Sequence, residues 1–233
     1  MKNFPKVFII VLNYNGKEVI RRCLSSVFKI DYPNFEVVVV DNCSIDGSFE
    51  LAKSYFGKAS FILNQANLGF SAGNNLGIRF ALERRADYVL RINNDTEVEK
   101  DFLSKLIEAA ESESRIGIVS PVIFDANSHE VWFSGGVIDW WKMKALHCRD
   151  SDTVEQKESQ FISGCAMLIK AEVFKSIGLL DEQFFLYWED VDFSLRSRME
   201  GYKNVVVRLS WVYHFEKSEK NREQKVYWLV LSG

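Results

Sequence analysis

The segment "YVLRINNDTEV", residues 88–98, begins as an apolar strand and ends on two amides and a carboxylate. Its first half suits a buried sheet, whereas Asn93, Asn94 and Asp95 do not. Asn and Asp favour turns, so these residues could simply close a loop. A carboxylate at the carboxyl end of a central strand is also where α/β proteins bind ligands. At this point both interpretations are open.

Polar side chains follow each of the first four predicted strands. The carboxyl ends of neighbouring parallel strands lie along one edge of a sheet, so these groups are expected to converge. A single such loop is explained by self-capping turns, but four together favour a polar ligand in the crevice. They are Asn13, Tyr14, Asn15 and Gly16, then Asp41 and Asn42, then Asn64, Gln65 and Asn67, and last Asn93, Asn94 and Asp95.

The sequence lacks the two common phosphate-binding loops. The first loop has no G-x-G-x-x-G, and no G-x-x-x-x-G-K-[ST] occurs. A phosphate in the crevice would therefore need another positive charge. A divalent metal held by Asp95 would supply it.

The elements that position these residues alternate regularly in the first half of the chain. Short β-branched segments alternate with segments of helical periodicity, which predicts a parallel sheet with right-handed crossovers. Strands are predicted over 7–12, 35–41, 60–64, 88–92 and 116–124, and helices over 17–28, 46–56, 71–85 and 101–112.

The second half is less regular. Segment 130–150 is rich in Trp, Gly and β-forming residues and predicts irregular strands or a flap, while the polar segment 151–160 predicts a mobile loop. The apolar end, 226–233, predicts a helix or membrane-facing element cut short by truncation. The other predicted elements are a strand over 161–170, a helix over 171–178, a helix beginning near Glu189 or Asp190, and a strand over 204–214.

Composition narrows the function classes. A chain of 233 residues that is 47% hydrophobic can form one large domain, and a net charge of -3 argues against general nucleic-acid binding. Cys23, Cys43, Cys148 and Cys165 form no C-x-x-C pair, which favours free thiols over zinc. Neither a signal peptide nor an apolar run of about 20 residues is present, so a cytoplasmic location is expected.

Seven motifs in order resemble the family 2 glycosyltransferases of the GT-A fold. The closest branch is the rhamnosyltransferase-like one, in which Asn-Asn-Asp replaces the more usual Asp-x-Asp. The motifs are "VLNYNG", "VVVVDNCSIDGS", "NLGFSAGNNLGI", "INNDTEV", "FISGCAMLI", "GLLDEQFFLYWEDVDFSLR" and "GYKNVVVRLSWVYH".

The resemblance implies an α/β, Rossmann-like fold with a mostly parallel sheet flanked by helices and an irregular acceptor-side half. Residues 1–124 would bind the nucleotide sugar, 125–216 would hold the acceptor and the base, and 217–233 would be a tail with possible membrane contact. The implied activity is inverting transfer from dTDP-rhamnose or a UDP-hexose to a glycan or lipid-linked glycan hydroxyl, in polysaccharide synthesis at the inner face of the cell membrane.

The resemblance also implies roles for single residues on the donor side. Asp41 would bind a pyrimidine base, and Asp95 would hold Mg²⁺ or Mn²⁺ against the diphosphate, with His214 completing the metal or phosphate site. The other donor-side residues are Asn13, Tyr14 and Asn15 near base and ribose, Asn67 and Asn74 beside the nucleoside, and Asn93 and Asn94.

On the acceptor side, the resemblance makes Asp190 the catalytic base. Glu189 and Trp188 would bind the acceptor, because carboxylates take sugar hydroxyls and aromatic rings stack on the apolar face of a pyranose. Acids at a helix N-terminus also stabilise the helix, which explains one carboxylate without a site. Asp192 is expected to pair with Arg196 instead.

Two other functions remain open from sequence. A sugar nucleotidyltransferase would share the sheet, but its Gly-rich N-terminal loop with Arg and Lys is poorly matched by "VLNYNGKEV". A catalytically inactive nucleotide-sugar-binding module is the other alternative, and the presence of Asp95 and Asp190 argues against it.

Overall fold

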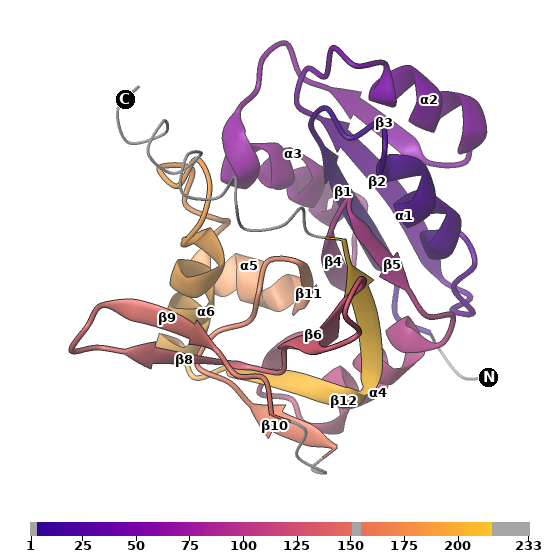
Figure 1. Ribbon diagram of the computed structural model, residues 1–233. Helices are drawn as coiled ribbons and strands as arrows, with labels where there is room; N and C mark the ends of the chain where they lie inside the picture. The colour runs from indigo at the N-terminus through magenta and orange to yellow at the C-terminus, as the bar shows by residue number, and fades with distance from the viewer. Residues whose placement is uncertain (1–3, 151–154, 216–233) are drawn as a thin grey trace.

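The computed structural model describes residues 4–150 and 155–215 (Figure 1). The strands are β1 Val7–Asn13, β2 Phe35–Asp41, β3 Ser60–Leu63, β4 Tyr88–Asn93, β5 Thr96–Val98, β6 Ile116–Asp125, β7 Val131–Phe133, β8 Gly136–Asp139, β9 Lys144–His147, β10 Gln156–Glu158, β11 Ala166–Lys170 and β12 Lys203–His214. The helices are α1 Ile20–Val27, α2 Ser48–Tyr55, α3 Gly69–Glu83, α4 Phe102–Ser112, α5 Ala171–Ile177 and α6 Glu189–Met199.

Within the described residues one sheet runs in the order β10-β12-β6-β11-β4-β1-β2-β3, with β5 beside β12 and β7 beside β6. The strands β3, β2, β1 and β4 are parallel, as predicted. Asn13 pairs with Asp41 at the ends of β1 and β2, so the polar loops begin at the same level of the sheet. The predicted α/β class with a mostly parallel central sheet is confirmed.

Helix α3 covers β1 and β2 at very short range, and a glycine permits this. A Cβ at Gly77 would lie 2.5 Å from Cγ2 of Ile10 and 3.1 Å from Cγ2 of Val40. Such distances are below van der Waals contact, so any larger residue would push the helix off the sheet. This close packing holds the N-terminal end of α3 near the carboxyl edge of the parallel strands.

The second half of the chain departs from the simple parallel pattern. Strand β11 runs antiparallel between β4 and β6, and β12 then pairs parallel with β6. The predicted strand over 161–170 is shorter than expected, because only 166–170 forms β11 and the residues before it form a loop.

Three further segments complete the comparison with the predicted elements. The short strand β5 was not predicted, and 156–158 of the predicted mobile loop form the edge strand β10, whereas 151–154 lie outside the described residues. Segment 130–150 forms β7 and the β8–β9 hairpin, in agreement with the predicted irregular strands. The tail 217–233 also lies outside the described residues.

Among residues 4–150 and 155–215, none of the helices combines the length and the apolar character needed to cross a membrane. Four free cysteines are present; Cys23 and Cys165 are buried, and Cys43 and Cys148 are partly buried.

Candidate active site

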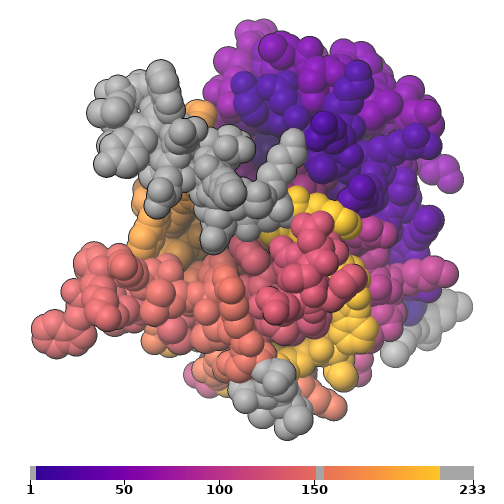
Figure 2. All heavy atoms as spheres, in the orientation of Figure 1, coloured from indigo at the N-terminus to yellow at the C-terminus, as the bar shows by residue number. Residues whose placement is uncertain are grey.

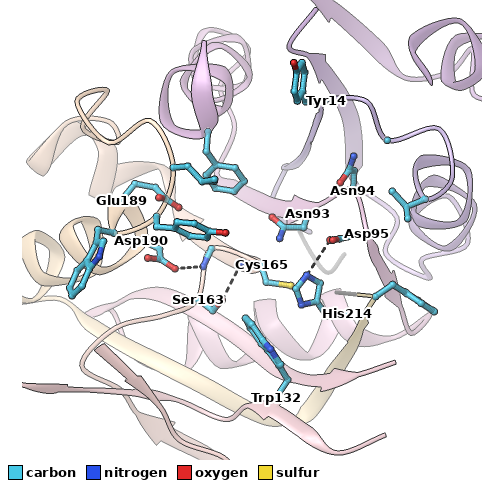
Figure 3. A pocket seen from close by; sticks show the side chains of 18 of the residues that line it. Tyr14, Asn93, Asn94, Asp95, Trp132, Ser163, Cys165, Glu189, Asp190 and His214 are labelled. Atoms are coloured by element: carbon cyan, nitrogen blue, oxygen red, sulfur yellow. Dashed lines mark hydrogen bonds and ion pairs between the residues drawn. The ribbon is translucent and has the colours of Figure 1, made fainter. Parts of the chain in front are cut away.

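A cavity of about 900 Å³ opens at the carboxyl ends of β1 and β4, where it separates the first half of the chain from α6 (Figure 3). Its volume is typical of sites that bind small molecules. Nine of the residues proposed from sequence line it: Tyr14, Asn15, Asn93, Asn94, Asp95, Trp188, Glu189, Asp190 and His214.

The polar loops of β1, β2 and β4 converge through the buried side chain of Asn13. Its Nδ2 donates to Oδ2 of Asp41 at 2.7 Å and to Oγ of Ser48 at 2.8 Å, and its Oδ1 accepts from Nδ2 of Asn94 at 2.8 Å. A Cβ at Gly16 would lie 2.4 Å from Oδ1 of Asn13, so a larger residue there would displace the Asn13–Asn94 contact. The expected convergence at the sheet edge is confirmed.

Asp41 has no exposed surface in this arrangement. While Oδ2 accepts from Asn13, Oδ1 accepts from the backbone N–H of Ser44 at 2.7 Å. The carboxylate thus organises the loop after β2 from within. Direct contact of Asp41 with a pyrimidine stays a prediction, and it requires this loop to open.

Asn67 and Asn74 also lie outside the cavity lining. Oδ1 of Asn67 accepts from the backbone N–H of Gly69 at 3.0 Å, which shapes the turn into α3. Asn74 is buried and donates to the carbonyl of Phe70, one turn earlier in the helix, at 2.9 Å. Their predicted contacts with the nucleoside therefore remain predictions.

Tyr14 and Asn15 are placed differently, because both line the cavity. Tyr14 is half exposed. Asn15 has a φ of 49°, which an asparagine tolerates better than most residues, and its Oδ1 accepts from the backbone N–H of Ile45 at 2.9 Å. An aromatic ring at the rim next to a fixed loop suits contact with a nucleoside.

Asp95 and His214 meet on the β4 side of the cavity (Figure 3). Oδ1 of Asp95 lies 3.2 Å from Nε2 of His214, because β5, which directly follows Asp95, pairs Thr96 with His214 at the end of β12. The ring centres of Trp132 and His214 lie 4.9 Å apart, so the indole packs against the imidazole and limits its rotation.

These donors fit a divalent cation that shares its coordination with a substrate. Oδ1 of Asn93 is buried without a hydrogen-bond partner beside the Asp95–His214 pair. In the described part of the chain no group of three His, Cys, Asp or Glu side chains is suited to a metal. One carboxylate, one imidazole and one amide oxygen would leave positions for phosphate oxygens and water, as Mg²⁺ sites usually do.

The loop before α6 is held in an unusual backbone conformation. Tyr187 and Trp188 have φ values of 69° and 71°, although neither is glycine. The left-handed region costs an ordinary residue about 1–2 kcal/mol, and such outliers cluster at functional sites. The turn brings Glu189 and Asp190 to the first turn of α6, at the cavity wall.

Contacts with the start of α3 stabilise this loop. The backbone N–H of Phe70 donates to the carbonyl of Phe185 at 2.6 Å. A Cβ at Gly69 would lie 2.7 Å from that same carbonyl oxygen, so glycine permits the contact. Helix α3 and the loop before α6 are therefore joined directly.

Asp190 is fixed by backbone donors. Its Oδ2 accepts from the N–H of Gly164 at 2.8 Å and its Oδ1 from the N–H of Val191 at 2.8 Å. Asp190 is partly exposed, whereas Glu189 is only 4% exposed. Both residues line the cavity, and Asp190 is the more exposed of the two.

Arg91 is the residue at this site that our sequence interpretation missed. It lies in β4 with no exposed surface, and its guanidinium is 3.8 Å from Oε1 of Glu189 and 5.0 Å from the ring centre of Phe70. Its three guanidinium nitrogens make no hydrogen bond to any described residue. The sequence does place one positive charge, Arg91, inside an otherwise apolar strand. That pattern could have indicated a buried acidic partner, because such a charge is rarely buried alone.

The electrostatics of this cluster follow from burial. Burial raises the pKa of Glu189 to about 7, and the charge of Asp190 adds to the rise, whereas Arg91 opposes it. Burial also raises the pKa of Asp190, against the opposing effects of the Gly164 N–H and Arg91. One buried cation thus faces two acids of increased proton affinity.

The other acids of this segment have structural roles. Oδ2 of Asp192 accepts from Nε of Arg196 at 2.8 Å, so the predicted pair is confirmed. Oδ1 of Asp181 accepts from the backbone N–H of Gln183 at 3.0 Å, as in an ordinary turn.

Two curated relatives that align with most of this chain are glycosyltransferases. The low-salt glycan biosynthesis hexosyltransferase Agl10 of Haloferax volcanii is 29% identical over 228 residues, 96% of this chain and 71% of its own length. An N-acetylglucosaminyl-diphospho-decaprenol L-rhamnosyltransferase of Mycobacterium tuberculosis is 24% identical, over 92% of this chain and 78% of its own length.

A solved structure shows the same fold. The crystal structure of GalNAc-T7 with UDP, GalNAc and Mn²⁺ aligns with a TM-score of 0.79 at 20% identity, over 94% of this chain. The chain spans 45% of that larger protein. The model of the family "Glycosyl transferase family 2" matches residues 8–178. The protein therefore belongs to glycosyltransferase family 2 and has the GT-A fold, as its motifs predicted.

Proposed function

We propose that the protein is an inverting glycosyltransferase that moves a sugar from a nucleoside-diphosphate donor to a hydroxyl of a glycan or lipid-linked glycan. The observation that carries the proposal is the cavity itself. It has metal-compatible donors, Asp95 and His214, on one side and an aspartate of its wall, Asp190, on the other. Inverting transfer needs these two functions on opposite sides of the sugar.

At the donor end, this chain's residues would bind and orient the leaving group. Tyr14 and Asn15 would contact the nucleoside, and Asp95 with His214 would hold a divalent ion. That ion would stabilise the negative charge that develops on the diphosphate. Asn93 would contribute its unpaired amide oxygen to the same place.

At the acceptor end, Asp190 would take the proton of the attacking hydroxyl. Its bonds to Gly164 and Val191 fix the carboxylate, so little side-chain freedom is lost when the acceptor binds. The raised pKa makes it a stronger base than an ordinary aspartate, which favours proton transfer from a hydroxyl. Trp188, which is 47% exposed, would stack on the acceptor sugar.

The donor is proposed to be dTDP-rhamnose or a UDP-hexose, and the acceptor a glycan that can be linked to lipid. Two relatives support this, a hexosyltransferase of glycan biosynthesis and a rhamnosyltransferase that acts on a decaprenol-linked sugar. A pyrimidine preference would come from Asp41 once the loop containing Ser44 opens. Uridine or thymidine diphosphate should then bind more tightly than adenosine diphosphate.

Donor hydrolysis tests the proposal. The protein is incubated with UDP- and dTDP-sugars in Mn²⁺ or Mg²⁺ and in EDTA, and released sugar is measured. We expect sugar release with metal, none in EDTA, and loss of turnover in Asp95→Asn with an unchanged melting temperature. Asp192→Asn, a matched change outside the cavity, should remain active. Full activity in chelator would refute the metal role, and absence of release from every nucleotide sugar would favour an inactive binding module.

A further inference from the structure

The β8–β9 hairpin exposes large apolar side chains at its tip. Trp141 is 98% exposed, Met143 73% and Trp140 59%. The hairpin projects from the body of the molecule, as the salmon-coloured lobe in Figure 2 shows. Isolated apolar residues are common on surfaces, but two adjacent tryptophans and a methionine on one projecting turn indicate a contact site.

The tip has a defined conformation. Oδ1 of Asp139 accepts from the backbone N–H groups of Trp141 at 3.1 Å and Lys142 at 3.0 Å, which closes the turn. At the root, a Cβ on Gly136 would lie 2.3 Å from the ring of Phe161, so the hairpin is packed tightly onto the body. The tryptophans are therefore presented on a fixed support.

The apolar surface continues along one face of the hairpin. Val137 and Leu146 are directly paired across the two strands and are 43% and 46% exposed. The next pair, Ile138 and Ala145, faces the other way, and Ala145 lines the cavity. One face of the hairpin is thus turned to the active site and the other is apolar and uncovered.

We propose that this hairpin docks the protein on an anionic lipid bilayer. Tryptophan is enriched at membrane interfaces because its ring is apolar and its N–H is polar. Lys142 and Lys144 flank Met143 and are exposed, so they would lie against anionic headgroups while the rings enter the interface. Nζ of Lys142 lies 3.7 Å from Oδ2 of Asp139, and with Lys144 the turn keeps a net positive charge although the whole chain has a net charge of -3.

Other occupants fit the tip less well. A stable protein–protein interface buries about 800 Å² on each partner, which a narrow turn of a few side chains cannot provide. A glycan is bound in a concave site that covers it, whereas Trp141 is almost fully exposed on a convex tip. Insertion of a small number of side chains into an interface is the contact that a projecting turn can make.

The position of the hairpin relates membrane docking to the cavity. Strand β9 carries Ala145 and His147 into the cavity wall. At about 3.4 Å per residue, the four residues of β9 span about 14 Å, so the part of the cavity wall at Ala145 and His147 would lie within about that distance of the bilayer surface. A lipid-linked acceptor could then reach Asp190 while its lipid stayed in the membrane. Vesicle binding itself does not depend on the proposed activity.

Sedimentation with vesicles tests the proposal. The full chain is mixed with vesicles of phosphatidylcholine and phosphatidylglycerol at a ratio of 3:1, and with phosphatidylcholine alone. We expect binding to the anionic vesicles that weakens with salt, and a loss on the order of tenfold or more in Trp140→Ser/Trp141→Ser. Lys142→Glu/Lys144→Glu should remove the preference for the anionic lipid.

Matched controls use apolar residues exposed elsewhere. Met199 is 87% exposed and Leu209 is 51% exposed, so Met199→Ser/Leu209→Ser changes similar surface away from the hairpin. This variant should bind vesicles as the parent does. Failure of the parent to bind, or equal binding by the tryptophan variant, would overturn the proposal. So would a dimer, detected by light scattering, that the tryptophan substitutions dissociate.

Discussion

Buried polar groups on the two sides of the cavity differ in how fully they are hydrogen-bonded. On the donor side, Asn13 is buried and its amide is fully used in hydrogen bonds to Asp41, Ser48 and Asn94. On the acceptor side, Arg91 is buried with no hydrogen bond from its guanidinium to the described residues, and Oε2 of Glu189 also lacks one. The Asn13 network is thus satisfied, whereas the Arg91–Glu189 pair is not; near Asp95, Oδ1 of Asn93 also lacks a partner among the described residues.

The difference predicts different effects of substitution in the two places. A satisfied network costs little and fixes loop geometry, so we expect the Asn13 network to act as a scaffold for the loops. Buried charges without hydrogen bonds are costly, and they persist where function requires them. The following predictions test this division, starting from the largest expected effect.

Asp190→Asn should lower turnover by about 10²–10⁴, the usual contribution of a general base. Donor-nucleotide affinity should be unchanged, because the residue lies across the cavity from Asp95. Single-turnover kinetics and nucleotide titration measure the two quantities. Glu189→Gln should mainly raise the acceptor KM. If Asp190→Asn were active and Glu189→Gln inactive, Glu189 would be the general base and the assignment of the two roles would be reversed.

Arg91→Met should destabilise the fold by about 3–5 kcal/mol at pH 8, because Glu189 and Asp190 lose the buried cation that opposes the rise in their pKa. Arg91 opposes the rise in the pKa of Glu189, so this pKa should rise further in the variant. The loss of stability should therefore shrink at pH 6, where the acids accept protons. Chemical denaturation at both pH values measures it. A loss that is independent of pH would mean that Arg91 acts through packing alone.

Asn13→Ala should cost about 1–3 kcal/mol, because Asp41 and Asn94 each lose a buried hydrogen bond. On the scaffold interpretation, donor KM should rise while turnover at saturation stays near normal. Asn34→Ala is a suitable control, since Asn34 is exposed and donates to the carbonyl of Phe4 at 2.8 Å away from the cavity. A large fall in turnover at saturation would show that Asn13 acts in the chemical step.

Glu189→Gln should also change how stability depends on pH. Glu189 has a folded-state pKa of about 7, above its ordinary value of 4.5, so the folded state retains a proton that the unfolded state releases. Raising the pH through this window therefore destabilises the parent, by at most about 1.4 kcal/mol per pH unit. Glu189→Gln lacks this effect, so its free energy of unfolding should rise relative to that of the parent between pH 5 and 7. Parallel stability curves would contradict the assignment.

The periodic part of the fold could be predicted from sequence, because local patterns determine it. The strand at 35–41 coincides with β2, and α6 begins at Glu189 as expected. The insertion of β11 between β4 and β6 could not be predicted, since strand order depends on pairing between distant segments. The exposure of Trp140 and Trp141 on the hairpin, outside the cavity lining, could not be predicted either, because it depends on how the hairpin is placed on the body.

The site was predicted in part, for a similar reason. Motifs identified Asp95, Asp190 and His214, which do line one cavity. They could not show that Asp41 and Asn74 are buried away from it, because burial of a polar residue depends on its tertiary partners. Arg91 was overlooked because its partners lie on α6, far along the chain.

The insertion of β11 also bears on synthesis of the chain. When β1 to β4 have left the ribosome, β4 is the open edge of an apolar sheet, and it stays open until residues 166–170 emerge. Open apolar edges pair with other chains and aggregate, and a charged side chain on the edge opposes this. Arg91 is such a charge. The same cation that faces Glu189 and Asp190 in the finished protein would therefore protect the nascent sheet from association.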